Sequence, residues 1–507
     1  MQPISPHKDF RVLFVYPNVM LITLLPVGIP VLHSCLKNAG FQTKLFDTTL
    51  YKTEETTFDM KKVDLLQLRK FSYEDVGVTV KKTDMTADFV QLVNEYKPDL
   101  ISFSIVQDTI GIAKQLLASI SDTNIPVIAG GVFPTLCPEE AISIEGIDII
   151  CVGEGEEALL ELCEGMYRKR DVKSIKNLWF KTDQGIIKNE IRRPSDINKL
   201  PYIDFDLFEK ERLYRPMQGK MYAMIHIEID RGCPYNCSYC ASPRLRELYQ
   251  TRTSRKYYRQ KNVDRVLDEM VALVKKYSPG YIDFNSETFL ARPIEDLKHF
   301  AARYKKEIGI PFWCQTRPET LNDEKVALLK DMGCKNMNIG IESGSEAFRK
   351  RVLKRTYSNE DILKGLQILD KYQIQYTLNN IIGFPDETRE NIFDTIDIIR
   401  QVHPTTVNVY IFAAYRGTPL FDYCVEKGYL EPDAAVHQLI YGTELKNQPL
   451  SYQQLKGIQR AFPLYTMLPD PDFDRIRLVE TFDEKGNAAF EELKKEFYEH
   501  VFKIKTP

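Results

Sequence analysis

The feature that most constrains the fold is an alternation of short apolar runs with longer amphipathic segments. Near the N-terminus, runs such as RVLFVYP, DLISFSIV and PVIAGG are separated by segments with helical periodicity, such as ADFVQLVNEY. Strands that alternate with helices predict a parallel, doubly wound α/β sheet, because a parallel connection needs a crossover that is usually helical. We place this Rossmann-like domain at residues 1–168.

The same alternation returns later in the chain, after an interruption. Residues 169–221 contain a predicted hairpin around residues 183–185 and an extended linker with two prolines. Residues 222–428 contain six further strand and helix units, which predict a partial (β/α)6 barrel with functional side chains at the C-terminal ends of its strands. Residues 429–507 predict a small, mainly helical segment, which we expect to close the mouth of the barrel and to select the substrate.

Composition and charge exclude several classes of protein. A formal net charge of -3 gives no electrostatic reason to expect nucleic acid or an anionic membrane as a partner. No apolar run reaches the roughly 20 residues of a membrane-spanning helix, and the polar N-terminus lacks the apolar core of a signal peptide. We therefore expect a cytoplasmic protein. In that compartment ten scattered cysteines do not predict a disulfide framework, whereas a local group of cysteines predicts a metal site.

Three of the cysteines, Cys233, Cys237 and Cys240, lie within eight residues, directly after the first strand of the predicted barrel. A structural zinc site needs four Cys or His ligands, and no fourth ligand is near in the sequence, which disfavours zinc. Thiolates also hold iron–sulfur clusters, usually one for each iron of a cubane, so three thiolates would leave one iron open to an external ligand. The sequence therefore predicts such a cluster at the C-terminal mouth of the barrel.

The CxxxCxxC spacing, with Tyr239 before the last cysteine, resembles the signature of radical S-adenosylmethionine (SAM) enzymes. The resemblance covers residues 222–428 and implies a 4Fe-4S cluster whose open iron binds SAM, which is cleaved to methionine and a 5'-deoxyadenosyl radical. Segments after the second, third and fourth strands would complete the SAM site, and IIGFPDET resembles the family's segment beside the adenine. The candidate SAM-binding residues are Tyr239, Ser286, Glu287, Gln315, Arg317, Glu342 and Ser343.

The ordered motifs of the N-terminal domain resemble the cobalamin (B12)-binding domain that precedes many radical SAM domains. The matching stretches include PDLISFS, GGVFPTLCPEE and IDIICVGEGE. Methionine-synthase-like domains carry a His that binds cobalt, but the corresponding SFSIVQDTIGIAK contains none, so we expect cobalamin without a His ligand. The candidate cobalamin-binding residues are Ser104, Gly130, Gly131, Val132, Phe133, Pro134, Thr135, Gly153, Glu154 and Gly155.

Together the two resemblances imply a cobalamin-dependent radical SAM enzyme, with methylation of an unactivated carbon as the expected reaction. One SAM molecule would supply the radical and another would remethylate the cobalt. Two alternatives keep the same architecture, namely a non-methylating radical reaction such as ring formation or rearrangement, and a cofactor-binding sensor without catalysis. A transfer-RNA methylthiotransferase is disfavoured, because the N-terminal domain lacks a second cluster motif and the C-terminal segment is not basic.

The expected partners are a small-molecule or peptide substrate and an electron donor such as flavodoxin or ferredoxin, without nucleic acid. The sequence does not identify the catalytic residues. Tyr410 and Tyr415, at the end of the sixth barrel strand, are candidates to line the substrate pocket or to donate hydrogen. Ordinary aromatic packing is the simpler interpretation of both.

Overall fold

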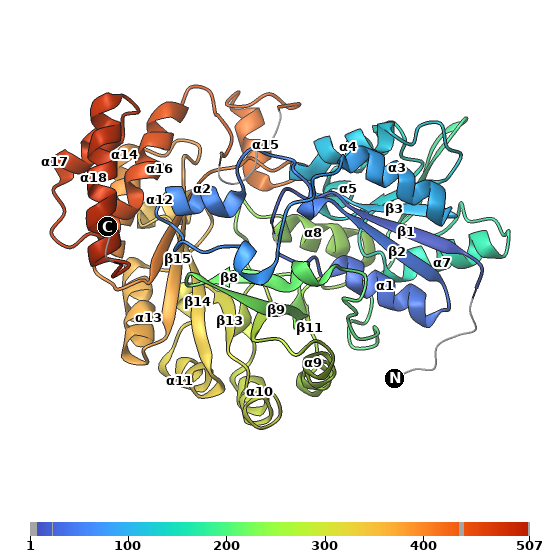
Figure 1. Cartoon of the computed structure of the whole chain (residues 1–507), viewed down its shortest axis with the longest axis horizontal. Helices are drawn as coiled ribbons and strands as arrows, with labels where there is room; N and C mark the ends of the chain where they lie inside the picture. Colours follow the sequence, from blue (N-terminus) through green and yellow to red (C-terminus); the bar gives the residue numbers. More distant parts are fainter. Residues whose placement is uncertain (1–7, 23, 435–440, 505–507) are drawn as a thin grey trace.

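The computed structural model describes residues 8–22, 24–434 and 441–504, and is built on two seven-stranded sheets (Figure 1). Residues 1–7, which begin the polar N-terminus noted above, lie outside the described residues. The first sheet has the order β2-β1-β3-β4-β5-β6-β7, and the first five of its strands along the chain are parallel, as predicted. These strands are β1 (Arg11–Tyr16), β2 (Gln42–Asp47), β3 (Leu100–Ser104), β4 (Val127–Gly130) and β5 (Ile149–Cys151).

Helices cover both faces of the first sheet because its strands are apolar on both sides. Val12 and Phe14 of β1 pack with α1 and α7, whereas Leu13 and Val15 pack with α3 and α4. The doubly wound arrangement is thus confirmed. The helices of this domain are α1 (Gly28–Asn38), α3 (Met85–Tyr96), α4 (Ile110–Ala118), α5 (Val132–Leu136), α6 (Pro138–Ser143) and α7 (Glu156–Tyr167), whereas α2 (Phe58–Asp64) lies in a segment that crosses to the second sheet (Figure 1).

The predicted hairpin forms, but it is continuous with the first sheet. Its strands are β6 (Leu178–Thr182) and β7 (Gly185–Lys188), and β6 pairs antiparallel with β5. Leu178 and Phe180 alternate into the core, and the hairpin covers an edge strand of only three residues. An exposed strand edge favours unwanted pairing, so this addition protects the sheet.

The second sheet has the order β16-β15-β14-β13-β12-β9-β8, and it curls into an open half-barrel. Six of its strands are parallel, as predicted, and β8 is added antiparallel to β9. The strands are β8 (Tyr214–Met217), β9 (Lys220–Glu228), β12 (Tyr281–Asn285), β13 (Phe312–Thr316), β14 (Cys334–Glu342), β15 (Gln375–Ile382) and β16 (Thr406–Ile411). The outer helices are α9 (Val263–Tyr277), α10 (Ile294–Glu307), α11 (Asp323–Met332), α13 (Asn359–Lys371) and α14 (Arg389–Ile399).

Short elements lie at the C-terminal ends of the barrel strands. They are the ribbon β10 (Asp230–Arg231) and β11 (Arg259–Gln260), and the helices α8 (Ser242–Thr253), α12 (Glu346–Arg351) and α15 (Pro419–Glu426). We call residues 232–241, between β10 and α8, the cysteine loop. It lies on the side of the half-barrel that faces the first domain, which is where α8 stands in Figure 1.

The C-terminal segment is helical, as predicted, but its helices flank the second sheet. α16 (Tyr452–Met467) packs on β16 and α14, and α17 (Phe473–Val479) and α18 (Glu484–His500) extend the layer outward (Figure 1). The first turn of α16 reaches the loop after β15, where Tyr452 and Leu455 lie beside Gly383 and Glu387. Within the described residues, no helix has the length and apolar character needed to cross a membrane.

A segment of the first domain crosses over to the second sheet. Residues 52–81 leave the first domain after β2 and return at the bridge between Tyr51 and Lys81, and Figure 1 shows α2 among the elements of the half-barrel. Gln67, which is 1% exposed, accepts a hydrogen bond from the Val409 N–H (3.1 Å) and donates one to the Val409 carbonyl (3.3 Å). Its amide therefore takes the place of a neighbouring strand at the edge of β16.

Candidate functional site

The cysteine loop brings the three predicted metal ligands together at the mouth of the half-barrel. Cys233, Cys237 and Cys240 are all half-buried and form no disulfide. Ser238 anchors the loop, because its N–H donates to the Leu353 carbonyl and its hydroxyl donates to the Val352 carbonyl. The loop thus has a defined backbone on which three sulfur atoms are presented.

The chemistry of this donor set fits an iron–sulfur cluster better than a single ion. Among the described residues, no three His, Cys, Asp or Glu side chains converge on one metal-ion position. The thiolates of a cubane bind different iron atoms and need not converge. Burial raises the pKa of the Cys233 thiol, and it raises that of Cys240 to about 12, so metal binding would have to release these protons.

Two of the predicted SAM-binding residues are joined by an arginine that sequence reasoning missed. Arg355, which is 3% exposed, donates to the Glu342 carboxylate (2.7 Å) and to the Tyr239 hydroxyl (2.8 Å). Glu342 ends β14 with a φ of 66°, at an irregularity in the pairing with β15. Arg355 stands in the basic run KRVLKR, which is typical of a solvated surface, so only the tertiary structure identifies it.

The other SAM candidates also lie around the cysteine loop. The Gln315 side chain donates to the Ser286 carbonyl (3.0 Å), and the Ser286 hydroxyl donates to Asp230 (2.6 Å). Glu287 is exposed, and Ser343 is fully buried at the end of β14. Arg317 is nearly buried, with its guanidinium beside Cys237. The structure therefore gathers all seven candidates at one end of the half-barrel.

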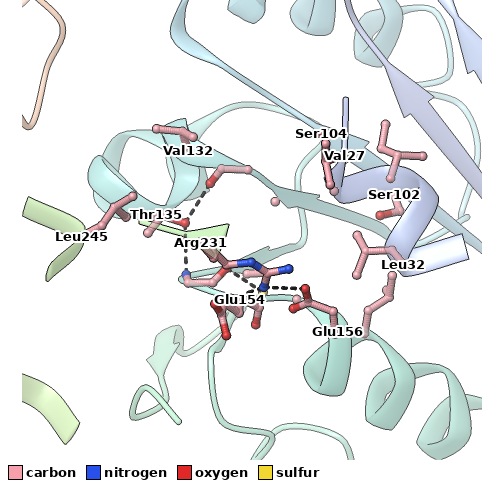
Figure 2. Close-up of a pocket in the computed structure, with 18 of the residues that line it drawn as sticks. Val27, Leu32, Ser102, Ser104, Val132, Thr135, Glu154, Glu156, Arg231 and Leu245 are labelled. Atoms are coloured by element: carbon pink, nitrogen blue, oxygen red, sulfur yellow. Dashed lines mark hydrogen bonds and ion pairs between the residues drawn. The ribbon is translucent and has the colours of Figure 1, made fainter. Parts of the chain in front are cut away.

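A cavity of about 400 Å³ separates the strand ends of the first sheet from the second domain (Figure 2). Eight of the ten predicted cobalamin-binding residues line it, whereas Phe133 and Pro134 are buried in the core behind its wall. The second domain contributes Arg231, Leu245 and Tyr249 among others. We call this space the interdomain cavity.

Glycines allow the loops that line this cavity to pack closely against their neighbours. Gly131 has a φ of 110°, and a Cβ there would lie 2.7 Å from the Ile105 carbonyl oxygen. Gly153 has a φ of 95°, and a Cβ there would lie 2.5 Å from the Tyr249 hydroxyl. Thr135 ties the two loops, because its hydroxyl donates to the Gly131 carbonyl and accepts from the Gly153 N–H (Figure 2). Both positions therefore require glycine.

The apolar part of the cavity fits a large ligand. Val132 is 45% exposed at its wall, and Val106, at the end of the neighbouring strand, is 39% exposed and lines a smaller adjoining cavity together with Val132. Large apolar side chains left exposed together at strand ends indicate a surface that a ligand covers. The wall thus suits the broad apolar face of a corrin, and none of its lining residues is a His.

Buried charges hold the two domains together beside the cavity. Arg231 contacts Glu154 (3.1 Å) and Glu156 (2.7 Å) of the first domain (Figure 2), and Glu228 (3.0 Å) at the end of β9. Burial alone would raise the pKa of the Glu154 carboxyl, but Arg231 and Arg259 outweigh burial and hold that pKa below its usual value. Because Arg231 precedes Cys233 by two residues, one side chain links the cavity wall to the cysteine loop.

The two tyrosine candidates have different surroundings. The Tyr415 hydroxyl donates to Asp108 of the first domain (3.0 Å), and both residues line a second cavity of about 170 Å³ that also touches Tyr239. Burial raises the pKa of Asp108 to about 6. Tyr410 instead stacks on Phe58 of α2, with ring centroids 6.5 Å apart. Tyr415 thus lies near the cysteine loop, whereas Tyr410 packs against an aromatic ring of the crossing segment.

Comparison with known families agrees with this division of the site. The Radical SAM superfamily model matches residues 227–399, and the B12 binding domain model matches residues 23–163. Among curated proteins, an uncharacterized methyltransferase of Pyrococcus horikoshii is 27% identical over 68% of this chain and 74% of its own length. The anaerobic magnesium-protoporphyrin IX monomethyl ester cyclase of Rubrivivax gelatinosus is 25% identical over 71% of this chain and 64% of its own length.

Solved structures share the fold across both domains. The cobalamin-dependent SAM radical enzyme OxsB, with aqua-cobalamin and SAM bound, matches with a TM-score of 0.67 at 15% identity, covering 97% of this chain and 72% of its own. The radical SAM methyltransferase TsrM of Kitasatospora setae matches with a TM-score of 0.63 at 19% identity, covering 87% of this chain and 84% of its own. At this identity the likeness shows a shared fold alone.

Proposed function

Because the chain is a radical SAM enzyme with an N-terminal B12-binding domain, we propose that it is a methyltransferase acting on an unactivated carbon. Its cofactors are a 4Fe-4S cluster, SAM and cobalamin. The observation that carries the proposal is that Arg231, which lines the interdomain cavity, stands two positions before Cys233 of the cysteine loop. Groups bound at the two positions would meet in the same space. The curated relatives named as methyltransferases support the same reaction.

Each bound group would have its own set of side chains. We propose that the three cysteines hold the cluster, and that Glu342, ordered by Arg355, contacts SAM. Gly131 and Gly153 shape the loops that would hold cobalamin in the interdomain cavity, and Val132 excludes water from its apolar face. When bound, the cluster and SAM supply a hydrogen-abstracting radical and cobalamin supplies a methyl group, while the chain supplies position and a dry site.

The remaining expectations complete this proposal. We propose a cytoplasmic protein that receives electrons from a donor such as flavodoxin or ferredoxin, and that acts on a small molecule or peptide. The domain limits at residues 168, 221 and 428 are proposed on the same basis, with the hairpin added to the first sheet.

Methyl-labelled SAM tests the proposal against other radical reactions. With its substrate, the enzyme should consume two SAM molecules per turnover and yield labelled product, 5'-deoxyadenosine and S-adenosylhomocysteine. Both by-products are needed because hydrogen abstraction cleaves SAM reductively, whereas replacing a methyl group on cobalt uses polar transfer. An unlabelled product formed with deoxyadenosine alone would reject methylation and leave the cofactors standing.

A ring-forming reaction is the second candidate, because one relative is named as a cyclase and matches over 71% of the chain. The same assay separates the two reactions. Ring formation would give deoxyadenosine without stoichiometric S-adenosylhomocysteine, and the product would have lost hydrogen without gaining the label.

A further inference from the structure

We propose that Arg317 is a positioning residue for the cluster, and that its hydrogen bond to the Cys237 sulfur sets the reduction potential. This inference rests on the proposed function, because it requires Cys237 to be a cluster ligand. It gives Arg317 a role different from the SAM contact that the sequence suggested. Arg317 is 7% exposed, and its Nη1 lies 3.1 Å from the Cys237 Sγ.

The guanidinium of Arg317 is held in place on three sides. Its Nε donates to the Glu319 carboxylate at 2.6 Å, within the same turn. Its plane lies over the Tyr235 ring, 3.8 Å from the ring centroid, and the Tyr357 ring lies 5.5 Å away on another element. A side chain held by a salt bridge and by aromatic contacts loses little further freedom when it bonds a sulfur. The Arg317 guanidinium is therefore already held in the position from which it donates to the Cys237 sulfur.

Arg317 differs from the other polar groups that contact the cysteine sulfurs. The Thr288 hydroxyl lies 3.8 Å from the Cys233 sulfur, and the Ser242 N–H donates to the Cys240 sulfur at 3.5 Å. Both of these groups are neutral. Arg246 is also close to the loop, but it donates to the backbone carbonyls of Cys233 and Tyr235. Of these four neighbours, Arg317 is the one that brings a positive charge to a sulfur.

A buried cation beside one sulfur has a predictable effect on reduction. Charge-assisted hydrogen bonds are stronger than neutral ones, and partners of metal ligands both orient the ligand and tune the metal. Reduction adds one electron, and so one negative charge, to the cluster. Salt and water screen a buried charge weakly, so Arg317 stabilises the reduced form more than the oxidised form. The potential of the cluster should therefore be higher with Arg317 than without it.

The test is a redox titration of anaerobically reconstituted protein without SAM, using dithionite as the one-electron reductant and electron paramagnetic resonance as the readout. At the midpoint potential of the wild type, we expect the ratio of reduced to oxidised cluster in R317Q to be at least tenfold lower. A tenfold change corresponds to a shift in midpoint potential of about 59 mV for a one-electron couple. R317K keeps the positive charge and loses the planar guanidinium, so its midpoint potential should lie between those of the wild type and R317Q. R244Q is the matched control, because Arg244 pairs with Glu247 and Asp422 at the surface near the same loop.

The outcomes separate this inference from the proposed function. A wild-type protein that assembles no cluster would overturn both. A normal cluster in R317Q with an unshifted midpoint and weakened SAM binding would overturn this inference alone, because Arg317 would then be a SAM ligand. If R317Q assembles no cluster, the R317K midpoint decides, and an unshifted value refutes the role of the hydrogen bond.

Discussion

Glu387 offers a quantitative test of the loop that follows β15. This residue lies in the segment IIGFPDET, is 2% exposed, and accepts hydrogen bonds from the N–H groups of Gly383 (2.6 Å) and Phe384 (3.3 Å). Burial raises the pKa of the Glu387 carboxyl to about 8, although these two hydrogen bonds favour the ionised form. The side chain is therefore mostly protonated at neutral pH, and the isosteric glutamine of E387Q should mimic this neutral form.

The raised pKa has a calculable effect on stability. The usual value is 4.5, so the folded protein binds this proton more tightly than the unfolded chain does. The resulting stabilisation is complete below about pH 4.5 and is lost as the pH rises toward 8. At about 1.4 kcal/mol per pH unit, the wild type should lose about 2.5 kcal/mol relative to E387Q between pH 5.5 and pH 7.5.

Thermal unfolding at several pH values measures this loss. For a domain of about 200 residues, 1 kcal/mol corresponds to roughly 2 to 4 °C in melting temperature. The difference in melting temperature between E387Q and the wild type should therefore increase by about 5 to 10 °C from pH 5.5 to pH 7.5, in favour of E387Q. E360Q is the matched control, because Glu360 is exposed on α13, and it should follow the wild type at every pH. Parallel profiles for E387Q and the wild type would refute the reasoning, because Glu387 would then be ionised throughout.

Three further variants test the cofactor sites. Replacing the three cysteines of the cysteine loop by Ala should abolish cluster absorption and all SAM cleavage, whereas Cys35→Ala should keep both; a triple variant that still cleaves SAM would reject the cluster site. Gly131→Ala should lose retention of hydroxocobalamin after desalting, because its Cβ would meet backbone 2.7 Å away, while Gly77→Ala has a similar φ in open space and should keep it. The wild-type spectrum should show no nitrogen ligand from His. Glu342→Ala should weaken SAM binding roughly 10- to 150-fold with the cluster intact, as expected for a lost hydrogen bond to a charged group of about 1.5 to 3 kcal/mol, and unchanged affinity would make Glu342 only the partner of Arg355. Glu346→Ala is the control, because this half-buried carboxylate pairs with Lys350.

Local patterns explain what the sequence could predict. The strands of both sheets were predictable because apolar runs and helical periodicity are properties of neighbouring residues. The three cysteines could be singled out for the same reason, because their spacing lies within one loop, and their role as cluster ligands stays a prediction. The predicted fold class and cofactors are confirmed by the two sheets and by the matched families.

Tertiary contacts explain what the sequence did not show. Arg355 belongs to a basic run of the kind found on a solvated surface. The folding of residues 342–355 brings it to Glu342, and only a contact across 116 positions brings it to Tyr239. The predicted hairpin could be placed in the first sheet only by its pairing with β5, because hairpin periodicity does not specify a neighbour. The crossing of residues 52–81 depends on contacts between positions more than 300 residues apart, which no local pattern encodes.

The Gln67 contact has a consequence for how the two domains can exist apart. A β-strand edge without a partner is a template for pairing with another chain, and without residues 52–81 the Val409 N–H of β16 would lose its Gln67 partner, although Gln459 of α16 would still donate to the Val409 carbonyl. A half-barrel produced without the first domain should therefore tend to aggregate through β16, even if each of its own helices forms. On this view a recombination that exchanged the B12-binding domain would also have to supply a cover for that edge. The amide of one glutamine thus helps to keep the two domains in a single chain.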